Sequence, residues 1–297
     1  MKIKANGIQI EVEDTGADGS QNDRPVVLLI MGLGMQLIAW PDDLVQMLVS
    51  RGYRVIRFDN RDCGLTTKVD APTPSIPDIL LKRRTPYTLD DMAGDAFGLL
   101  DHLGIERAHL VAHDYGTSVA TELIARRERG LLPIELASLT LCNGSMHIEL
   151  ARLKLTQKLL KHRTFGPLLA RLTSKRLFVA QMRSILGDPA AVSEAELELH
   201  FELLLHNDGR RHLAAVSRYH EDRWRFWHRW IGALTRLDLP THVLWGRRDP
   251  VAVPAIAEQL AREIPGARLT WLDELGHYPM LEDPARWSTA LLGALAE

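Results

Sequence analysis

Residues 107–127 read RAHLVAHDYGTSVATELIARR, and this stretch decides the fold. The apolar run His109–His113 predicts a buried strand, and the residues from Thr117 to about 127 predict a helix. Ala112 and Gly116 are small and stand two positions either side of Asp114, the spacing that a sharp strand-to-helix turn requires. Helix N–H groups favour negative charge at such a turn. We therefore expect Asp114 to project as a carboxylate, although aspartate also commonly caps helices.

Similar apolar runs recur along the chain, with amphipathic patterns between them. They are Val26–Met31, Arg54–Asp59, Leu136–Cys142, His242–Gly246 and Arg268–Leu272. Near-continuous apolar strands alternating with helices predict an α/β architecture, a mostly parallel doubly wound sheet covered on both faces. The alternating segment Ile8–Glu13 predicts an antiparallel edge. Chemistry is expected at the carboxyl ends of the parallel strands.

One interval breaks this rhythm, because residues 145–235 contain helical patterns and no strand-like run. We interpret it as a helical lid inserted between strands, which divides the core into residues 1–144 and 236–297. An independent helical domain is the alternative. The basic run from Arg152 to Arg176 reads as a solvated face, so no membrane contact is expected.

Composition limits the function classes. The 297 residues contain 36 Lys and Arg against 38 Asp and Glu, a net charge of −2. Nucleic-acid binders usually show a large basic excess, so no nucleic acid is expected. The first sixteen residues lack the apolar core of a signal peptide, and two cysteines are too few for a disulfide framework. We expect a cytoplasmic monomer or homodimer, with no cofactor and no metal.

The identity of the central residue selects the chemistry. A carboxylate attacks esters poorly, because it would form an anhydride, but it displaces a leaving group from an sp3 carbon to give an alkyl ester. Hydrolysis of that ester needs a histidine to activate water and an acid to orient the histidine. Asp249 and His277 follow later strands in nucleophile–acid–histidine order. The tetrahedral anion needs N–H donors, for which we expect Tyr115 and Leu33, the latter in a Gly-rich turn.

At these residues the chain resembles an α/β-hydrolase. From His113 onward, AHDYGTSVATEL, WGRRDPV and GHYPMLEDP are similar to the epoxide hydrolase and haloalkane dehalogenase superfamily, in particular its mesoderm-specific-transcript-like members. The resemblance implies Asp114 as nucleophile, His277 as base and Asp249 as orienting acid. The amino-terminal segments MGLGMQLIAWP and VIRFDNRDCGL resemble a carboxylesterase subfamily with a serine nucleophile, which suggests a natural or engineered junction before the turn.

Two departures from the resemblance bear on the reaction. Relatives with an aspartate nucleophile usually have His-Gly-x-Pro at the oxyanion turn, where this chain has Met31-Gly32-Leu33-Gly34. Dehalogenases usually have Trp after the nucleophile as a halide donor, and Tyr115 stands there instead.

An epoxide also needs a proton donor for its alkoxide. The resemblance implies Tyr219 for this role, and His147 is a candidate second donor. Trp224, Trp227 and Trp230 fall at three-residue spacing, so we expect them to share roughly one face and to pack in the core first and line a pocket second. The candidate substrate-binding residues are His147, Trp40 and Trp224.

The sequence therefore predicts a lidded hydrolase that acts on a small apolar substrate through an ester on Asp114. Epoxide hydrolysis to a vicinal diol is the favoured reaction. Haloalkane dehalogenation, carboxylester hydrolysis and a catalytically silent binding protein remain as alternatives.

Overall fold

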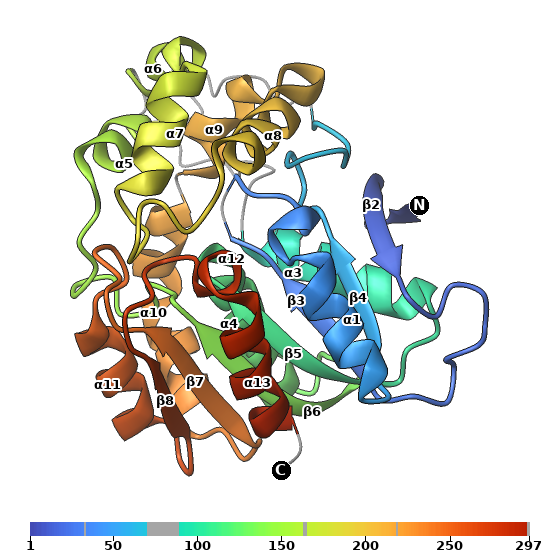
Figure 1. Ribbon diagram of the computed structural model, residues 1–297. Coiled ribbons are helices and arrows are strands. Elements are labelled where there is room, and N and C mark those ends of the chain that lie inside the picture. Colours follow the sequence, from blue (N-terminus) through green and yellow to red (C-terminus); the bar gives the residue numbers. More distant parts are fainter. Residues whose placement is uncertain (33, 70–88, 163–164, 218, 296–297) are drawn as a thin grey trace.

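The computed structural model describes residues 1–32, 34–69, 89–162, 165–217 and 219–295, with the backbone alone described at Tyr219. A central sheet lies between two layers of helices, and a group of further helices stands beyond one edge of the sheet (Figure 1). The Pro-rich stretch 71–77 and Thr88 lie outside the described residues.

Eight strands form one sheet, in the order β1-β2-β4-β3-β5-β6-β7-β8. They are β1 (Lys2–Ala5), β2 (Ile8–Asp14), β3 (Val26–Ile30), β4 (Arg54–Phe58), β5 (Arg107–His113), β6 (Glu135–Cys142), β7 (Thr241–Gly246) and β8 (Arg268–Leu272). The strands from β3 to β8 pair in parallel, whereas β1 with β2 and β2 with β4 pair antiparallel. The prediction of a mostly parallel sheet with an antiparallel edge is confirmed.

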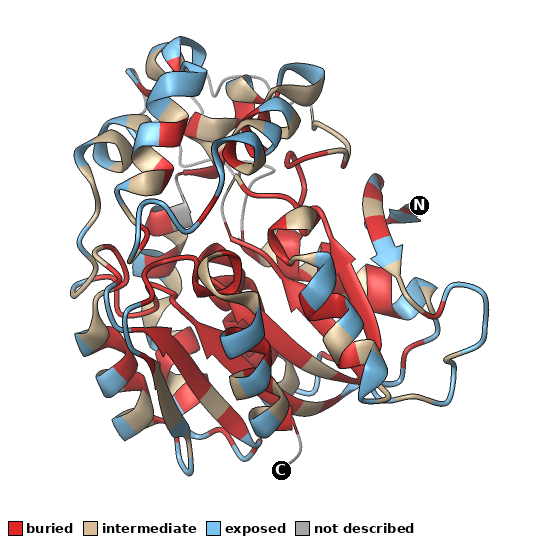
Figure 2. Cartoon of the chain, in the orientation of Figure 1, coloured by how far each residue is buried: buried red, intermediate tan, exposed pale blue. Residues whose placement is uncertain are grey.

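β3 and β4 are buried along their whole length because helices cover both faces of the sheet. One face packs on α3 (Leu89–His102), α4 (Tyr115–Glu128) and α11 (Pro254–Glu263), and the other on α1 (Asp42–Ser50) and α13 (Pro284–Leu295). Figure 2 shows the sheet as buried throughout its centre. Short helical turns complete the core at η1 (Leu37–Ala39) and α12 (Pro279–Glu282).

The chain between β6 and β7 forms a helical insertion, by which we mean α5 to α10. Its elements are α5 (Leu155–Leu160), α6 (Gly166–Leu172), α7 (Lys175–Arg183), α8 (Glu194–Leu205), η2 (His206–Asp208), α9 (Arg210–Val216) and α10 (Tyr219–Thr235). In Figure 1, α5 to α9 lie beyond the carboxyl ends of the parallel strands, while α10 runs alongside α4. No described helix is both long and apolar enough to cross a membrane.

The three tryptophans of α10 do not share one face. Trp230 is buried, whereas Trp224 is 61% exposed. Each three-residue step advances 300° around a helix, so two steps carry a side chain about 120° from its starting direction. Core packing therefore holds for Trp230, but the expectation of a common face that includes Trp224 is wrong.

Candidate active site

Asp114 occupies a strained turn between β5 and α4. Its φ of 46° and ψ of −113° lie outside the regions that residues with a side chain normally adopt. The turn brings the chain so close to β3 that a Cβ on Gly116 would lie 2.3 Å from the carbonyl oxygen of Ile30. A Cβ on Gly32 would lie 2.8 Å from Asp114 Oδ2. Only glycine fits at both positions, and the spacing argument for a tight turn has this physical basis.

The Asp114 backbone is held by hydrogen bonds, and its side chain does not cap α4. The Asp114 N–H donates to the carbonyl of Cys142 (3.0 Å), and the Asp114 carbonyl accepts from the N–H of Thr117 (3.2 Å). The carboxylate makes no capping hydrogen bond to α4, although Asp114 is the N-cap residue. The helix-capping interpretation therefore does not explain an aspartate at this position.

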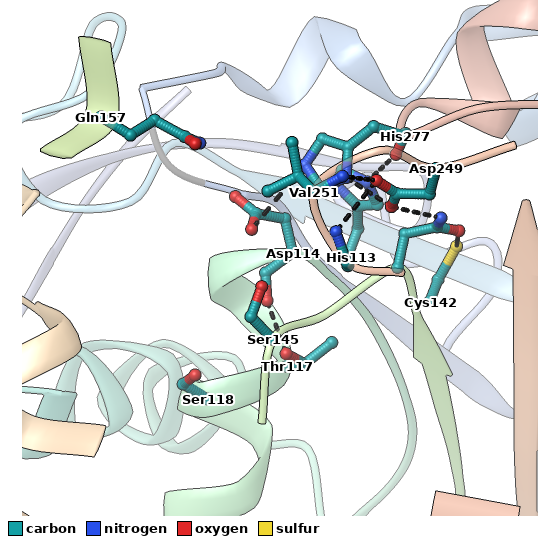
Figure 3. A network of polar contacts seen from close by, with 12 residues as sticks. His113, Asp114, Thr117, Ser118, Cys142, Ser145, Gln157, Asp249, Val251 and His277 are labelled. Atoms are coloured by element: carbon teal, nitrogen blue, oxygen red, sulfur yellow. Dashed lines mark hydrogen bonds and ion pairs between the residues drawn. The ribbon is translucent and has the colours of Figure 1, made fainter. Parts of the chain in front are cut away.

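The structure brings the three predicted residues together at the carboxyl ends of their strands (Figure 3). His277 Nδ1 lies 2.7 Å from Asp249 Oδ2, and His277 Nε2 lies 3.8 Å from Asp114 Oδ1. All three side chains are at least nine-tenths buried. The imidazole thus stands between two carboxylates, with one nitrogen on each, and a short movement or a water molecule would bridge it to Asp114.

Asp249 is fully occupied by hydrogen-bond donors. Its Oδ1 accepts from the N–H groups of Val251 (2.7 Å) and Ala252 (2.9 Å). Its Oδ2 accepts from Asn143 Nδ2 (2.7 Å) as well as from His277. Four donors and the absence of exposed side-chain surface fix the orientation of Asp249. It therefore presents the imidazole with a permanent acceptor.

Asn143 is a site residue that the sequence analysis missed. It follows β6 directly, has a φ of 45°, and accepts from the N–H of Gly246 (3.0 Å) while donating to Asp249. The available signal was an Asn-Gly pair at the end of a predicted core strand, which reads equally well as an ordinary turn.

Charge decides the protonation of His277. Burial would lower the pKa of His277, but the charge and hydrogen bond of Asp249 and the charge of Asp114 outweigh it and raise the pKa to about 9. At neutral pH the free protein therefore holds an imidazolium between two carboxylates. Removing the charge of Asp114, as an ester bond would, lowers the pKa and makes the neutral base easier to form.

His113 hydrogen-bonds to the loop that carries His277. Its Nε2 lies 2.7 Å from the backbone carbonyl of His277, so this nitrogen carries the proton and donates it. Burial lowers the pKa of His113 to about 4, which keeps the ring neutral. Trp40 is fully buried and packs against the rings of His113 and Trp287. Trp40 was expected to bind substrate, but it lies behind the site.

Of the two residues expected to donate N–H groups to an oxyanion, the structure describes Tyr115 but not Leu33. Tyr115 is the first residue of α4, where backbone N–H groups point out of the helix end beside Asp114. Its phenol is buried and donates to the sulfur of Met92, so the ring packs towards α3. Leu33 lies outside the described residues.

The other residues expected to contact substrate lie between β6 and β7, and the two whose side chains are described are poorly placed for that role. Both ring nitrogens of His147 are taken, by Glu149 (2.9 Å) and Glu263 (2.8 Å), which argues against proton donation to a substrate. Trp224 is too exposed to line an enclosed pocket. Tyr219 begins α10, but its side chain lies outside the described residues.

The insertion contributes two groups near Asp114 that the sequence analysis did not select. Arg223 is buried and donates from Nε to Ser118 Oγ and from Nη1 to the carbonyl of Ser145, both at 2.6 Å. His220 lies close enough to Asp114 for their charges to interact. Burial, with the positive charges of Arg223 and Lys161, lowers the pKa of His220 to about 3, so it is neutral at pH 7.

The insertion also makes close backbone contacts with the loop that carries His277. The His277 N–H donates to the carbonyl of Ile185 (2.9 Å), just beyond α7. A Cβ on Gly276 would lie 2.3 Å from the backbone nitrogen of Gly187, so the two backbones touch. Glu282 accepts from the N–H groups of both Gly187 (2.7 Å) and Gly276 (2.9 Å), which locks them together.

Comparison with known proteins agrees with the fold described above. The chain matches the family described as alpha/beta hydrolase fold over residues 25–284. The chain belongs to the α/β-hydrolase family. The predicted resemblance is thereby confirmed at the level of family and fold.

Its relatives span several activities. The LipZ hydrolase of Mycobacterium tuberculosis is 34% identical over 86% of this chain and 90% of its own length. The human mesoderm-specific transcript homolog protein is 32% identical over 97% of this chain and 83% of its own. Epoxide hydrolase 3 of Siraitia grosvenorii is 36% identical, over 40% of this chain and 32% of its own. A continuous match to one relative over 97% of the chain gives no support to a junction before the turn.

Proposed function

We propose that this α/β hydrolase opens epoxides to vicinal diols through a covalent ester on Asp114. The observation that carries the proposal is a carboxylate in the position of the turn nucleophile, 3.8 Å from His277 Nε2, with His277 Nδ1 on the fixed carboxylate Asp249. A carboxylate nucleophile fits a reaction at an sp3 carbon better than attack on an ester carbonyl.

In the first step Asp114 Oδ attacks an epoxide carbon, a carbon–oxygen bond of the ring breaks, and the departing oxygen takes a proton. Tyr219 is the proposed proton donor, since the resemblance to epoxide hydrolases places a tyrosine there. His220 beside it has a strongly lowered pKa and is uncharged at neutral pH, so it does not offer a ready proton. The product is a hydroxyalkyl ester of Asp114.

In the second step water attacks the Asp114 carboxyl carbon after giving a proton to His277. His277 is free to accept it, because esterification has removed one of the charges that held its own proton. The N–H of Tyr115, at the end of α4, is the proposed donor to the tetrahedral anion. Collapse breaks the acyl–oxygen bond, and the departing diol oxygen takes the proton from His277. The second proton of the water leaves the Asp114 carboxyl and restores the phenol of Tyr219, while one oxygen of the water stays in Asp114.

Dehalogenation is the nearest competitor, because it shares the ester intermediate. It is less well supported, since a departing halide needs polar donors and the Tyr115 side chain is turned towards Met92. Carboxylester hydrolysis is the second competitor. It would require attack by a group other than Asp114. Ser118 is unsuited to this role, since it lies within α4 and accepts a hydrogen bond from Arg223.

The intermediate provides the test. We expect His277→Gln to accumulate the ester, visible by intact mass as the protein plus one epoxide, on the peptide that contains Asp114. The double variant Asp114→Ala/His277→Gln is the control and should stay unmodified. A single turnover of the wild type in oxygen-18 water should label Asp114 and leave the diol unlabelled.

Substrate class is tested on a panel of epoxides, haloalkanes and nitrophenyl esters. Tyr219→Phe should slow epoxide opening about 10²–10⁴-fold, the usual contribution of general acid catalysis, with no effect on halide displacement. Turnover of esters that survives Asp114→Ala would reject the ester mechanism. Halide release without epoxide turnover would select dehalogenation, and a lack of any turnover or adduct would favour a binding protein.

A further inference from the structure

The outer part of the helical insertion combines two properties that rarely occur together on a solvated surface. Residues 150–187 contain nine lysines and arginines and no aspartate or glutamate, although the whole chain has a net charge of −2. Figure 2 shows much of α5 to α7 as exposed. The same helices expose large apolar side chains. They are Leu155, Leu159, Phe165, Leu168, Leu172 and Leu177.

The apolar side chains follow helical spacing. Leu155 and Leu159 lie four residues apart on α5, and Leu168 and Leu172 lie four apart on α6, so each pair lies on one helix face. Phe165 extends the α6 face by one turn. The exposed fractions reach 71% for Leu155 and 65% for Leu172. Because α5 packs against α6, these residues lie on neighbouring helices, and together with Leu177 on α7 we call them the outer face.

Cations border the outer face. Lys158 precedes Leu159 on α5, Arg171 precedes Leu172 on α6, and Arg176 precedes Leu177 on α7. All three are exposed, and none forms an ion pair with a carboxylate in the part of the chain that the structure describes. Long basic side chains can keep their charge at a polar boundary while their stems cover apolar surface. An apolar stripe with basic flanks is the pattern of helices that lie in a membrane interface.

We propose that the outer face docks this protein on an anionic phospholipid surface. The leucines and Phe165 would enter the boundary between headgroups and acyl chains, and the lysines and arginines would bind the phosphates. A second copy of the chain fits less well, because a twofold interface pairs a patch with itself and would bring the exposed cations Lys158, Arg171 and Arg176 against a second set of the same charge. Simple solvation leaves six exposed large apolar side chains unexplained.

This inference is independent of the reaction at Asp114, although it has a consequence for it. The insertion stands over the carboxyl ends of the strands, so docking through its outer face would bring the site to the surface in which apolar substrates dissolve. The proposal replaces the sequence-based interpretation of the basic run as a solvated face, which had no information on exposure.

The test is flotation of the full chain with two kinds of vesicle, pure phosphatidylcholine and an equal mixture of phosphatidylcholine and phosphatidylglycerol. Each cation near an anionic surface contributes roughly a five-fold factor, from about 1 kcal/mol, so preference for the mixed vesicles should exceed ten-fold. Added salt should weaken binding, since it screens exposed charges.

Two variants separate the contributions, each with a matched control. Lys158→Glu/Arg176→Glu should reduce binding to mixed vesicles by at least about 25-fold. Arg129→Glu, an exposed change on the core, should leave binding unchanged.

Leu168→Ser/Leu172→Ser should reduce binding about ten-fold or more by removing inserted apolar area. Leu131→Ser, exposed outside the insertion, should have no effect.

Several results would overturn the proposal: equal binding to both vesicles, no binding, or indifference to both outer-face variants. A stable dimer in sedimentation that Leu168→Ser/Leu172→Ser dissociates would instead assign the face to self-association. Turnover of a water-soluble substrate should be unchanged in every variant, so failure of docking and failure of the proposed reaction are distinguishable.

Discussion

Replacing Asp249 with asparagine tests whether geometry or charge controls His277. The Oδ1 position accepts two backbone N–H groups, so an asparagine must place its carbonyl oxygen there. Its NH₂ then takes the Oδ2 position, facing the donor Asn143 Nδ2 and His277 Nδ1. His277 Nδ1 must become an acceptor, which puts the ring proton on Nε2, the nitrogen that has to receive a proton from water.

Two effects of the change oppose one another. Loss of the carboxylate charge lowers the pKa of His277 from about 9, which could raise the neutral fraction at pH 7 by up to about 100-fold. The wrong tautomer costs about 10⁴-fold in a comparable triad. We therefore expect ester hydrolysis at pH 7 to slow by about 10²–10⁴-fold, and the full effect of about 10⁴ above pH 9, where the wild-type imidazole is already neutral.

The assay separates the two half-reactions by quenched flow and intact mass. Formation of the ester should stay within about ten-fold of the wild type, because Asp114 is untouched, while its decay slows and the adduct accumulates. Asp273→Asn is the control, since it removes an exposed carboxylate from the neighbouring loop. Decay as fast as in the wild type at pH 7, or faster, would refute the tautomer argument and leave charge as the controlling factor.

Three further predictions concern packing and titration. Gly116→Ala should lower the free energy of unfolding by about 2–3 kcal/mol in urea titrations, because its Cβ would lie 2.3 Å from the carbonyl oxygen of Ile30. If ester decay limits turnover, kcat should rise with pH as His277 loses its proton, with a midpoint below 9; a midpoint at or above 9 would contradict relief of charge in the ester. Burial lowers the pKa of His200 to about 4, so the stability it contributes is complete above pH 6.5 and is lost between 6.5 and 4, at about 1.4 kcal/mol per pH unit. In urea titrations across that range, the free energy of unfolding should depend less steeply on pH in His200→Gln than in the wild type. The exposed variant His102→Gln should keep the wild-type pH dependence.

The fold was predictable because its determinants are local. Strands buried on both faces produce continuous apolar runs, and β3 to β8 correspond to such runs within a residue or two at each end. Asp114 could be selected because the close approach of the turn to Ile30 excludes a side chain at Gly116, which leaves a spacing signature in the sequence.

The partners of polar side chains were not predictable, because they come from distant parts of the chain. Asn143 lies 106 residues from Asp249, and a sequence pattern does not show that the two meet. His147 was predicted as a proton donor, but its Nε2 is occupied by Glu263, which lies 116 residues away in the sequence. Exposure has the same origin, since nothing local distinguishes the exposed Trp224 from the buried Trp230.

The insertion helps to position His277 but not Asp114, and this difference matters for engineering. Ile185 and Gly187 hold the loop of His277, whereas Asp114 is positioned by β3, β5 and α4. Under the proposed reaction, transplanting the α5–α9 segment of a relative would preserve the attacking group, Asp114, and disturb the water-activating one, His277. Such hybrids would become alkylated once and then stall, and restoring turnover would require mutations around residues 185–187 and 276 before any remodelling of the pocket.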